Sequence, residues 1–205
     1  MGEAVALIDY GAGNLHSVDN ALKRVGAEPV LVSDGDALGQ AERIVLPGVG
    51  AFGACYRGLA ALPGMIEALE QRVLRDGKPF LGICVGMQLL ATRGLEHGET
   101  AGLGWIGGEV RALEPSEAVK VPHMGWNDVR VATDTSGLIA PGEAYFLHSY
   151  AFDVADEAHL AARTDHGGPV TAAVARDNIL GVQFHPEKSQ AYGLALLDQF
   201  LRWKP

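Results

Sequence analysis

Short apolar runs alternate with apolar stripes of helical spacing through the first half of the sequence, and this alternation constrains the fold more than any other feature. Four runs have the length and composition of buried strands: residues 5–8, 29–32, 43–46 and 80–83. Two stretches between them carry apolar residues on one helical face: Leu15, Val18, Leu22 and Val25, and then Met65, Ile66, Leu69 and Val73 within a helix expected over about residues 63–75. Repeated strand–helix units favour a mostly parallel sheet with helices on both faces, in which ligands bind at the carboxyl ends of the strands.

The second half of the sequence has a different pattern. Between residues 103 and 180, short strand-like segments are separated by Gly, Pro and Asp turns, and a final helix is expected over about residues 189–203, with Leu194, Leu197 and Leu201 facing inward. We interpret the short segments as antiparallel strands added to the same domain, because no long linker, repeat or low-complexity tract divides the chain. The prediction is a three-layer α/β fold in a single domain over residues 1–205. A chain of this length can bury ~70% of its unfolded surface in one core.

Charge and composition exclude several classes of protein. The formal net charge is −9 and no cluster of Lys or Arg occurs, so neither a nucleic acid nor an anionic membrane is expected as a partner. Residues 1–9 lead directly into the first strand without a basic region, a long apolar stretch or a cleavage site, and no run reaches the length of a membrane span. We therefore expect a soluble, cytoplasmic protein.

The segment Gly-Ile-Cys-Val-Gly at residues 82–86 has the pattern of a nucleophile elbow, with cysteine in the place where an esterase carries serine. It follows a strand-like run and precedes a helix-like stretch at residues 87–92. We expect the two glycines to allow a sharp turn that holds Cys84 in a strained, exposed position. The N–H groups and dipole of a helix N-terminus favour a thiolate, so Cys84 is the candidate nucleophile.

A base for this nucleophile is expected about a hundred residues downstream. Residues 179–184 are strand-like, so His185 leaves the end of a strand and Glu187 follows on the same side by the period-two rule. This spacing lets Glu187 hold one imidazole nitrogen while the other faces Cys84, and Pro186 stiffens the link. We predict a Cys84–His185–Glu187 triad, in which the acid orients the histidine and the histidine deprotonates the thiol.

Each feature alone also fits a structural interpretation. A cysteine after a strand is more often a small buried hydrophobe, and a lone histidine is more often an ordinary core or surface residue. The conjunction of the elbow with His-Pro-Glu favours catalysis. Cys55 lacks the elbow context, and we interpret it as a packing residue. Neither the cysteines nor the histidines have ligand spacing, so we predict no metal site and no cofactor.

A loop and a helix residue that we expect near Cys84 can complete a site. Pro-Gly-Val-Gly at residues 47–50 ends the third strand, and its backbone N–H groups, together with that of Val85, are candidates for an oxyanion hole. Taken alone, the same loop could be only a turn. Gln88 follows Cys84 by one helical turn, so its amide is expected to donate to and accept from a substrate amide or carboxylate.

The strand-like run at residues 145–150 ends in polar groups. Ser149 and Tyr150 are expected to present backbone or hydroxyl groups to the α-amino end of a ligand. His148 is an alternative to His185 as the base. We favour His185, because an acid lies two residues after it at a strand end and no such acid follows His148.

These motifs resemble those of the triad-type (class I) glutamine amidotransferases, whose cysteine attacks the side-chain amide of glutamine and releases ammonia. The matching segments are residues 47–50, 82–88 and 185–187. Residues 9–15 and 122–127 further resemble the glutaminase subunits of imidazole glycerol phosphate synthases, in histidine biosynthesis. The resemblance spans nearly the whole chain. Val85, where leucine is commoner in the family, retains an apolar residue.

The resemblance implies a division of labour between two subunits. Cys84 forms a γ-glutamyl thioester from L-glutamine, His185 passes a proton to the departing ammonia and then activates water, and Glu187 orients His185. Ammonia passes to a (β/α)₈-barrel cyclase in a heterodimer, which forms imidazole glycerol phosphate and an aminoimidazole carboxamide ribotide. The remaining implied roles are glutamine contacts at Gly50, Gln88, Ser149 and Tyr150, a movable oxyanion N–H at Val49, and a subunit interface at Asn14, Trp126, Tyr145 and Lys188.

Three alternatives stay open at this point. A glutaminase subunit of the same architecture could feed anthranilate, pyridoxal phosphate or guanylate synthesis, although residues 9–15 and 122–127 favour the histidine pathway. A cysteine peptidase on a related fold would need an open peptide groove. A catalytically silent binding or regulatory subunit is disfavoured by the intact Cys84, His185 and Glu187.

Overall fold

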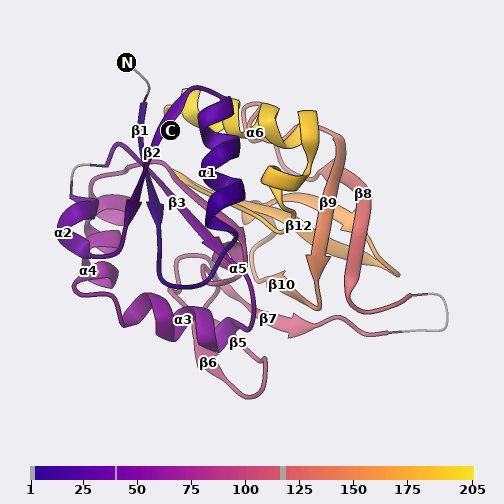
Figure 1. The fold of residues 1–205 in the computed structure, drawn as a ribbon. Helices are drawn as coiled ribbons and strands as arrows, with labels where there is room; N and C mark the ends of the chain where they lie inside the picture. The colour runs from indigo at the N-terminus through magenta and orange to yellow at the C-terminus, as the bar shows by residue number, and fades with distance from the viewer. Residues whose placement is uncertain (1–2, 40, 116–118) are drawn as a thin grey trace.

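A large sheet forms the centre of the computed structural model, which describes residues 3–39, 41–115 and 119–205 (Figure 1). Among these residues, nine strands make the sheet, in the order β2-β1-β3-β4-β13-β12-β11-β8-β9. Their bounds are Glu3–Ile8 (β1), Ala27–Val32 (β2), Arg43–Gly48 (β3), Phe80–Cys84 (β4), His123–Val131 (β8), Gly142–His148 (β9), Leu160–Asp165 (β11), Pro169–Arg176 (β12) and Ile179–Val182 (β13). The first two residues of the expected N-terminal segment lie outside the described residues.

The two halves of this sheet differ in strand direction. Neighbours from β2 to β13 are parallel, whereas the pairs that join β13, β12, β11, β8 and β9 are antiparallel. Strands β4 and β13 are adjacent and parallel, with Ile83 opposite Val182, so the segments that follow them leave the same edge of the sheet. The predicted architecture, a parallel sheet with antiparallel strands added in the second half, is confirmed.

A smaller sheet packs beside the large one, in the order β10-β7-β5-β6. Its bounds are Arg93–Gly94 (β5), Thr100–Ala101 (β6), Gly108–Ala112 (β7) and Tyr150–Val154 (β10). The chain passes from β9 of the large sheet to β10 of the small sheet through the single residue Ser149. Ser149 and Tyr150 therefore lie at the junction of the two sheets.

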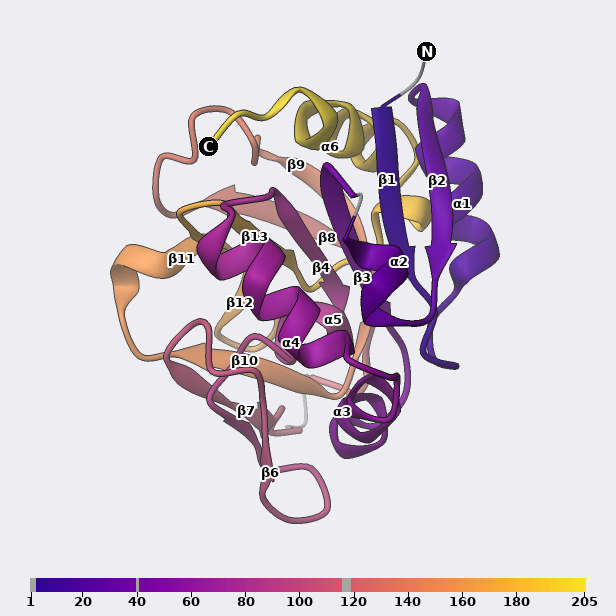
Figure 2. The same ribbon diagram turned by 90° about the vertical axis from the view of Figure 1, so that its left-hand side faces the viewer.

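Helices cover both faces of the large sheet. On one face α1 (Leu15–Arg24) packs against α6 (Gln190–Arg202), and on the other lie α2 (Gly35–Leu38), α4 (Met65–Leu69) and the π-helical turn η1 (Glu70–Arg75), as Figures 1 and 2 show. The expected helical stripes point into the core, since these members are buried: Val18, Leu22, Met65, Leu69, Val73, Leu197 and Leu201. In the described part of the chain, a helix with the length and hydropathy needed to cross a bilayer is absent.

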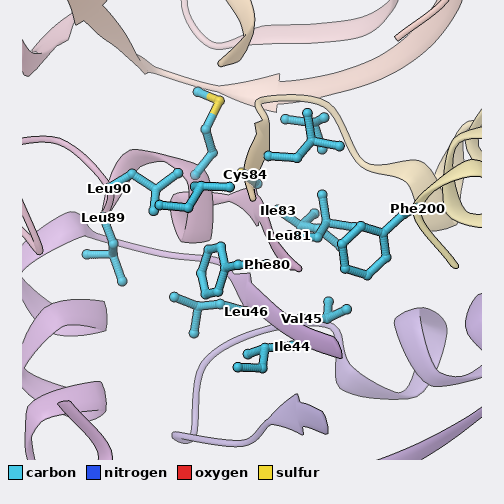
Figure 3. Close-up of a cluster of buried hydrophobic side chains, with 14 of the residues drawn as sticks. Ile44, Val45, Leu46, Phe80, Leu81, Ile83, Cys84, Leu89, Leu90 and Phe200 are labelled. Atoms are coloured by element: carbon cyan, nitrogen blue, oxygen red, sulfur yellow. The ribbon is translucent and has the colours of Figure 1, made fainter. Parts of the chain in front are cut away.

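A cluster of buried apolar side chains surrounds β3 and β4 between the helical layers (Figure 3). Val45 and Leu81 lie toward Phe200 of α6, and Leu46 and Phe80 lie on the opposite side (Figure 3). All four strand residues are fully buried. Because alternate residues of a strand point to opposite faces, a strand covered on both faces must be apolar throughout.

Two helices differ from the sequence-based expectation. The helix after Cys84, α5 (Val85–Gln88), has a single turn and does not extend over residues 87–92. It ends because the carbonyls of residues 89–91 accept hydrogen bonds from N–H groups of residues 103–106. Helix α3 (Phe52–Ala60) was not predicted, since its two glycines lower helix propensity. Gly58 instead permits close packing, because a Cβ there would lie 3.0 Å from the Tyr10 carbonyl oxygen.

Candidate active site

Cys84 lies at the corner between β4 and α5 in a backbone conformation that L-residues rarely adopt. Its φ is 55° and its ψ is −113°, which is strain of the kind expected at a nucleophile elbow. The expected exposure is wrong, because Cys84 is buried and only 4% exposed. The flanking glycines have a different role from the expected one, because neither has a positive φ. Close packing requires them: a Cβ at Gly86 would overlap the carbonyl oxygen of Leu46, and a Cβ at Gly82 would lie 2.6 Å from the carbonyl oxygen of Gly86.

His185 and Glu187 follow β13, the strand beside β4. His185 Nδ1 lies 2.8 Å from Glu187 Oε1. We expected a strand to place Glu187 on the same side as His185. Instead, β13 ends at Val182 and Pro186–Lys188 forms a 3₁₀ turn (η3). The turn, and not a strand, brings the carboxylate back to the imidazole. Proline suits its first position, where the missing N–H has no helical partner.

The protonation of His185 depends on its two neighbours. Burial disfavours the imidazolium, but hydrogen bonding and the charges of Cys84 and Glu187 outweigh burial and raise the pKa of His185 to about 9. Because Glu187 occupies Nδ1, Nε2 is the nitrogen left for Cys84. The arrangement can therefore move a proton between Sγ of Cys84 and Nε2 of His185.

His148, the alternative base, has both ring nitrogens engaged elsewhere. Its Nδ1 lies 2.8 Å from the Tyr150 carbonyl oxygen, and its Nε2 lies 2.9 Å from Nδ1 of His123. Burial lowers the pKa of His148 to about 3. The geometry therefore favours His185 over His148 as the group that exchanges a proton with Cys84.

A cavity of about 290 Å³ opens beside Cys84. This volume lies near the lower end of the range for ligand pockets, about 300–1,000 Å³, and suits a ligand of amino-acid size. Its lining brings together nine residues predicted from sequence: Val49, Gly50, Cys84, Val85, Gln88, Ser149, Tyr150, His185 and Lys188. A larger hollow of about 680 Å³, beside the end of α6, contains none of them.

The expected oxyanion donors come from two different loops. Val85 is the first residue of α5, so its N–H has no partner within the helix. Val49 follows β3, and its carbonyl oxygen accepts a hydrogen bond from Sγ of Cys55 at 3.4 Å. The Tyr10 hydroxyl donates to the Pro47 carbonyl oxygen of the same loop at 2.8 Å. Cys55, predicted to be a packing residue, is buried and also anchors this loop.

Gln88 is bound by the protein more extensively than expected. Its Nε2 donates to the Tyr150 carbonyl oxygen at 3.0 Å and to Oε1 of Gln183 at 2.9 Å, which leaves only Oε1 for a ligand. Gln183 was not predicted as a site residue. It is fully buried, and its Nε2 donates to Sγ of Cys84 at 3.7 Å. The available signal was a polar residue inside an apolar run just before His185.

Glu96 is a second residue that sequence reasoning missed. Among the described residues that line the cavity it is the only acidic one. Its Oε2 accepts the backbone N–H of Phe52 at 2.7 Å and so caps the start of α3. The sequence around Glu96 carries no recognisable motif, so only the folded chain reveals its position.

Three of the four expected interface residues lie together near the cavity. Trp126 and Tyr145 are opposite each other on β8 and β9, with ring centroids 6.2 Å apart. The ammonium of Lys188, which also lines the cavity, lies 5.8 Å from the centre of the Tyr145 ring. Asn14 precedes α1, and this helix packs against η3. Trp126 and Met124 are 48% and 66% exposed, so an apolar surface adjoins the cavity.

A family model and two relatives of similar sequence each match nearly the whole chain. The family model "Glutamine amidotransferase class-I" matches residues 6–203. The imidazole glycerol phosphate synthase subunit HisH of Zymomonas mobilis is 60% identical over 205 residues, which cover 98% of this chain and 96% of that protein. The subunit of the same name from Rhodospirillum rubrum is 53% identical over 212 residues, covering 98% and 99% of the two chains.

Solved structures with a similar fold have more distant sequences. A crystal structure of a glutamine amidotransferase matches with a TM-score of 0.74 over 96% of this chain and 97% of that chain. The structure of PurLQS from Thermotoga maritima matches with a TM-score of 0.73 over 98% of each chain. Sequence identity is 21% in both cases, so these structures support the fold alone. They confirm the expected class I glutamine amidotransferase architecture.

Proposed function

The chain belongs to the class I glutamine amidotransferases, among the HisH subunits of imidazole glycerol phosphate synthase, and from this premise we propose that it hydrolyses L-glutamine and delivers the ammonia to a cyclase partner. The catalytic groups in this proposal are Cys84, His185 and Glu187, within a single domain over residues 1–205. The observation that supports it most is that Cys84 and His185 line one cavity, with Glu187 hydrogen bonded to the imidazole.

The proposed reaction has two halves. Sγ of Cys84 attacks the side-chain amide carbon of glutamine, and His185 gives a proton to the amide nitrogen as the carbon–nitrogen bond breaks. Ammonia leaves, and a γ-glutamyl thioester remains on Cys84. His185 then takes a proton from water, the resulting hydroxide attacks the thioester, and glutamate is released with regeneration of the thiol. Glu187 keeps His185 oriented in both halves and stabilises its imidazolium.

The tetrahedral intermediates carry a negative charge on oxygen. We assign its stabilisation to the backbone N–H groups of Val85 and Val49, which border the same cavity. Losing one such donor typically costs about 10²–10³ in rate, so the position of the Val49 loop has a large effect on turnover. That loop is anchored by Cys55 and Tyr10, and its rearrangement is the step that we expect a partner to control.

The polar lining of the cavity fits an amino-acid ligand. The α-ammonium of glutamine requires acceptors, and the carboxylate of Glu96 and Oε1 of Gln88 are both available along the wall. We assign further contacts to Gly50, Ser149 and Tyr150, which border the same space. The recognition of glutamine thus combines one carboxylate with neutral amide and backbone groups.

The proposed partner is the (β/α)₈-barrel cyclase of histidine biosynthesis, bound as a heterodimer. Ammonia at neutral pH is mostly protonated and is then not nucleophilic, so a glutaminase without an acceptor wastes glutamine. We therefore expect slow hydrolysis by the isolated chain and strong stimulation by the cyclase with its nucleotide. Trp126, Tyr145 and Lys188, with Asn14, are assigned to the interface. Rapid hydrolysis by the chain alone would contradict this coupling.

The test of the proposed function is ammonia transfer in the complex with the cyclase. Cys84→Ala should abolish synthesis from glutamine and leave synthesis from added ammonium salts intact, because only the source of ammonia is removed. Loss of both activities would indicate a damaged assembly and would not support a nucleophilic role for Cys84. Retention of both would reject that role. Wild-type chain mixed with an anthranilate, pyridoxal phosphate or guanylate synthase should show no transfer.

A further inference from the structure

Two buried histidines outside the proposed triad form a hydrogen-bonded pair beside the cavity. His123 on β8 and His148 on β9 are directly opposite in the strand register. Nδ1 of His123 lies 2.9 Å from Nε2 of His148. Both residues are almost completely buried. Groups in such surroundings need well-defined partners, because an unsatisfied polar atom in the interior is costly.

The partners of the pair determine where its protons lie. Nδ1 of His148 is 2.8 Å from the Tyr150 carbonyl oxygen, which can only accept, so this nitrogen carries a proton. Neutral His148 then has a bare Nε2, which accepts the Nδ1–H of His123. His123 in turn has a bare Nε2, which accepts Nδ2–H of Asn127 at 3.0 Å.

The orientation of the Asn127 amide is fixed independently of the histidines. Its Nδ2 also donates to the Asp165 carbonyl oxygen at 2.7 Å, and its Oδ1 accepts the backbone N–H of Asp128 at 2.8 Å. Burial lowers the pKa of His123 to about 4 and that of His148 to about 3, so both rings are neutral near pH 7. All donors therefore point the same way, from β8 toward the cavity.

The Tyr150 carbonyl joins this chain of hydrogen bonds to the cysteine. It accepts Nε2–H of Gln88 at 3.0 Å in addition to the Nδ1–H of His148. Gln88 donates its second hydrogen to Gln183, whose own amide donates to Sγ of Cys84. The position of the Gln88 amide therefore depends on a carbonyl that His148 helps to hold.

We propose that His123 is a positioning residue for glutamine hydrolysis, because its Nδ1–H orients His148 and thereby holds the Tyr150 carbonyl and the Gln88 amide. This inference rests on the proposed function and extends it to a residue that does not border the cavity. Alternate residues of a strand face opposite sides, so Met124 points to solvent while His123 points inward.

Two substitutions at His123 separate hydrogen-bond donation from packing. His123→Asn places an amide N–H near the position of Nδ1. His123→Phe retains a flat ring between Phe146 and His166, the rings that stack on His123 at centroid distances of 4.7 and 4.1 Å, but it has no donor. Thr164→Val is the matched control, because Thr164 is a buried polar residue on β11 whose hydroxyl has no hydrogen-bond partner in the described part of the chain.

Each variant is assembled with the cyclase, and two reactions of the complex are measured. The first gives kcat and KM for glutamine, and the second is synthesis from ammonium salts. We expect His123→Phe to lower kcat/KM for glutamine about tenfold or more, because Nε2 of His148 loses its donor. The loss should appear chiefly as a higher KM, since Gln88 contacts the part of glutamine that does not react. His123→Asn and Thr164→Val should stay within about threefold of wild type, and ammonium-dependent synthesis should not change in any variant.

Several results would overturn the inference. The first is a loss of kcat/KM for glutamine that is the same in His123→Phe as in His123→Asn or Thr164→Val. The second is a kcat/KM of His123→Phe equal to that of wild type. The third is a loss of ammonium-dependent synthesis in His123→Phe. Nitrogen-15 NMR of the ring nitrogens provides a readout that does not depend on turnover: His123 and His148 must both be protonated at Nδ1 and bare at Nε2. A wild-type complex that fails to hydrolyse glutamine would reject the proposed function itself.

Discussion

Oε1 of Glu187 lies 2.8 Å from Nδ1 of His185, and the two side chains are only 1% and 3% exposed. The second carboxylate oxygen, Oε2, is buried and has no hydrogen-bond partner among the described residues. The charge of Glu187 therefore acts mainly on one imidazole. A buried carboxylate with a single partner is costly for folding. The presence of Glu187 at this position is therefore better explained by catalysis than by stability.

Glu187→Gln retains the shape of the side chain and removes its charge. We expect kcat for glutamine in the complex to fall by as much as about 10⁴-fold, because the imidazolium and the correct tautomer of His185 lose their support. Synthesis from ammonium salts should remain at the wild-type rate. Steady-state kinetics of the two reactions provide the measurement, and an unchanged kcat for glutamine would show that the charge of Glu187 has no catalytic role.

The same pair predicts how stability depends on pH. The pKa of His185 in the folded chain is about 9, above the usual value of 6.5, so the imidazolium stabilises the fold fully below pH 6.5 and this contribution is lost as the pH rises through 9. The difference in unfolding free energy between wild type and Glu187→Gln should therefore shrink over this range. Urea denaturation at several pH values measures it. A difference that grows with pH would contradict the assignment.

The core of the site was predictable because its signals are local. The elbow around Cys84 and the segment at residues 185–187 each lie within a few residues, and neighbouring parallel strands bring them together. The structural reasons expected for two of these features were wrong. Glu187 reaches His185 through a 3₁₀ turn, although a strand was expected, and Gly86 serves close packing, although conformational freedom was expected. The periodicity of side chains in the sequence does not reveal either cause.

Other parts of the site depend on pairing between distant segments. His123 meets His148 only because β8 and β9 pair in one particular register, and a shift of β8 by one residue would turn His123 to the opposite face, away from His148. Gln183 and Glu96 likewise gain their roles from contacts with Gln88 and with the start of α3. No local motif specifies such contacts, so the structure is needed to find them.

Gly86→Ala tests the packing explanation of the elbow. The new Cβ would overlap the Leu46 carbonyl oxygen, which belongs to a buried strand and cannot move cheaply. We expect the free energy of unfolding to fall by about 3 kcal/mol, the upper part of the usual range for overpacking. Gly107→Ala is the control, because a Cβ there meets nothing nearer than 3.8 Å. Equal stability of the two variants in urea denaturation would refute the explanation.

The two cysteines should differ in reactivity. Cys84 borders the cavity and has His185 as a neighbour, whereas Cys55 does not border it and burial raises the pKa of Cys55. We therefore expect iodoacetamide to label the native chain at Cys84 alone, as peptide mass spectrometry can show. Cys84→Ser should lose the label, and Cys55→Ser should retain it. Comparable labelling of both residues would contradict the distinction.

Trp126 offers a test of the partner surface that does not depend on catalysis. It is half exposed beside Met124 on the outer side of β8, and large exposed aromatic residues often dominate the affinity of protein interfaces. We expect Trp126→Ala to weaken binding to the cyclase by about 2 kcal/mol, which raises Kd roughly 30-fold. Val131→Ala, an exposed apolar change at the other end of the same strand, should leave Kd within about threefold of wild type. Calorimetric titration measures both values. If the two variants bind equally well, the outer side of β8 near the cavity is not the docking surface, and Trp126 must be removed from the proposed interface.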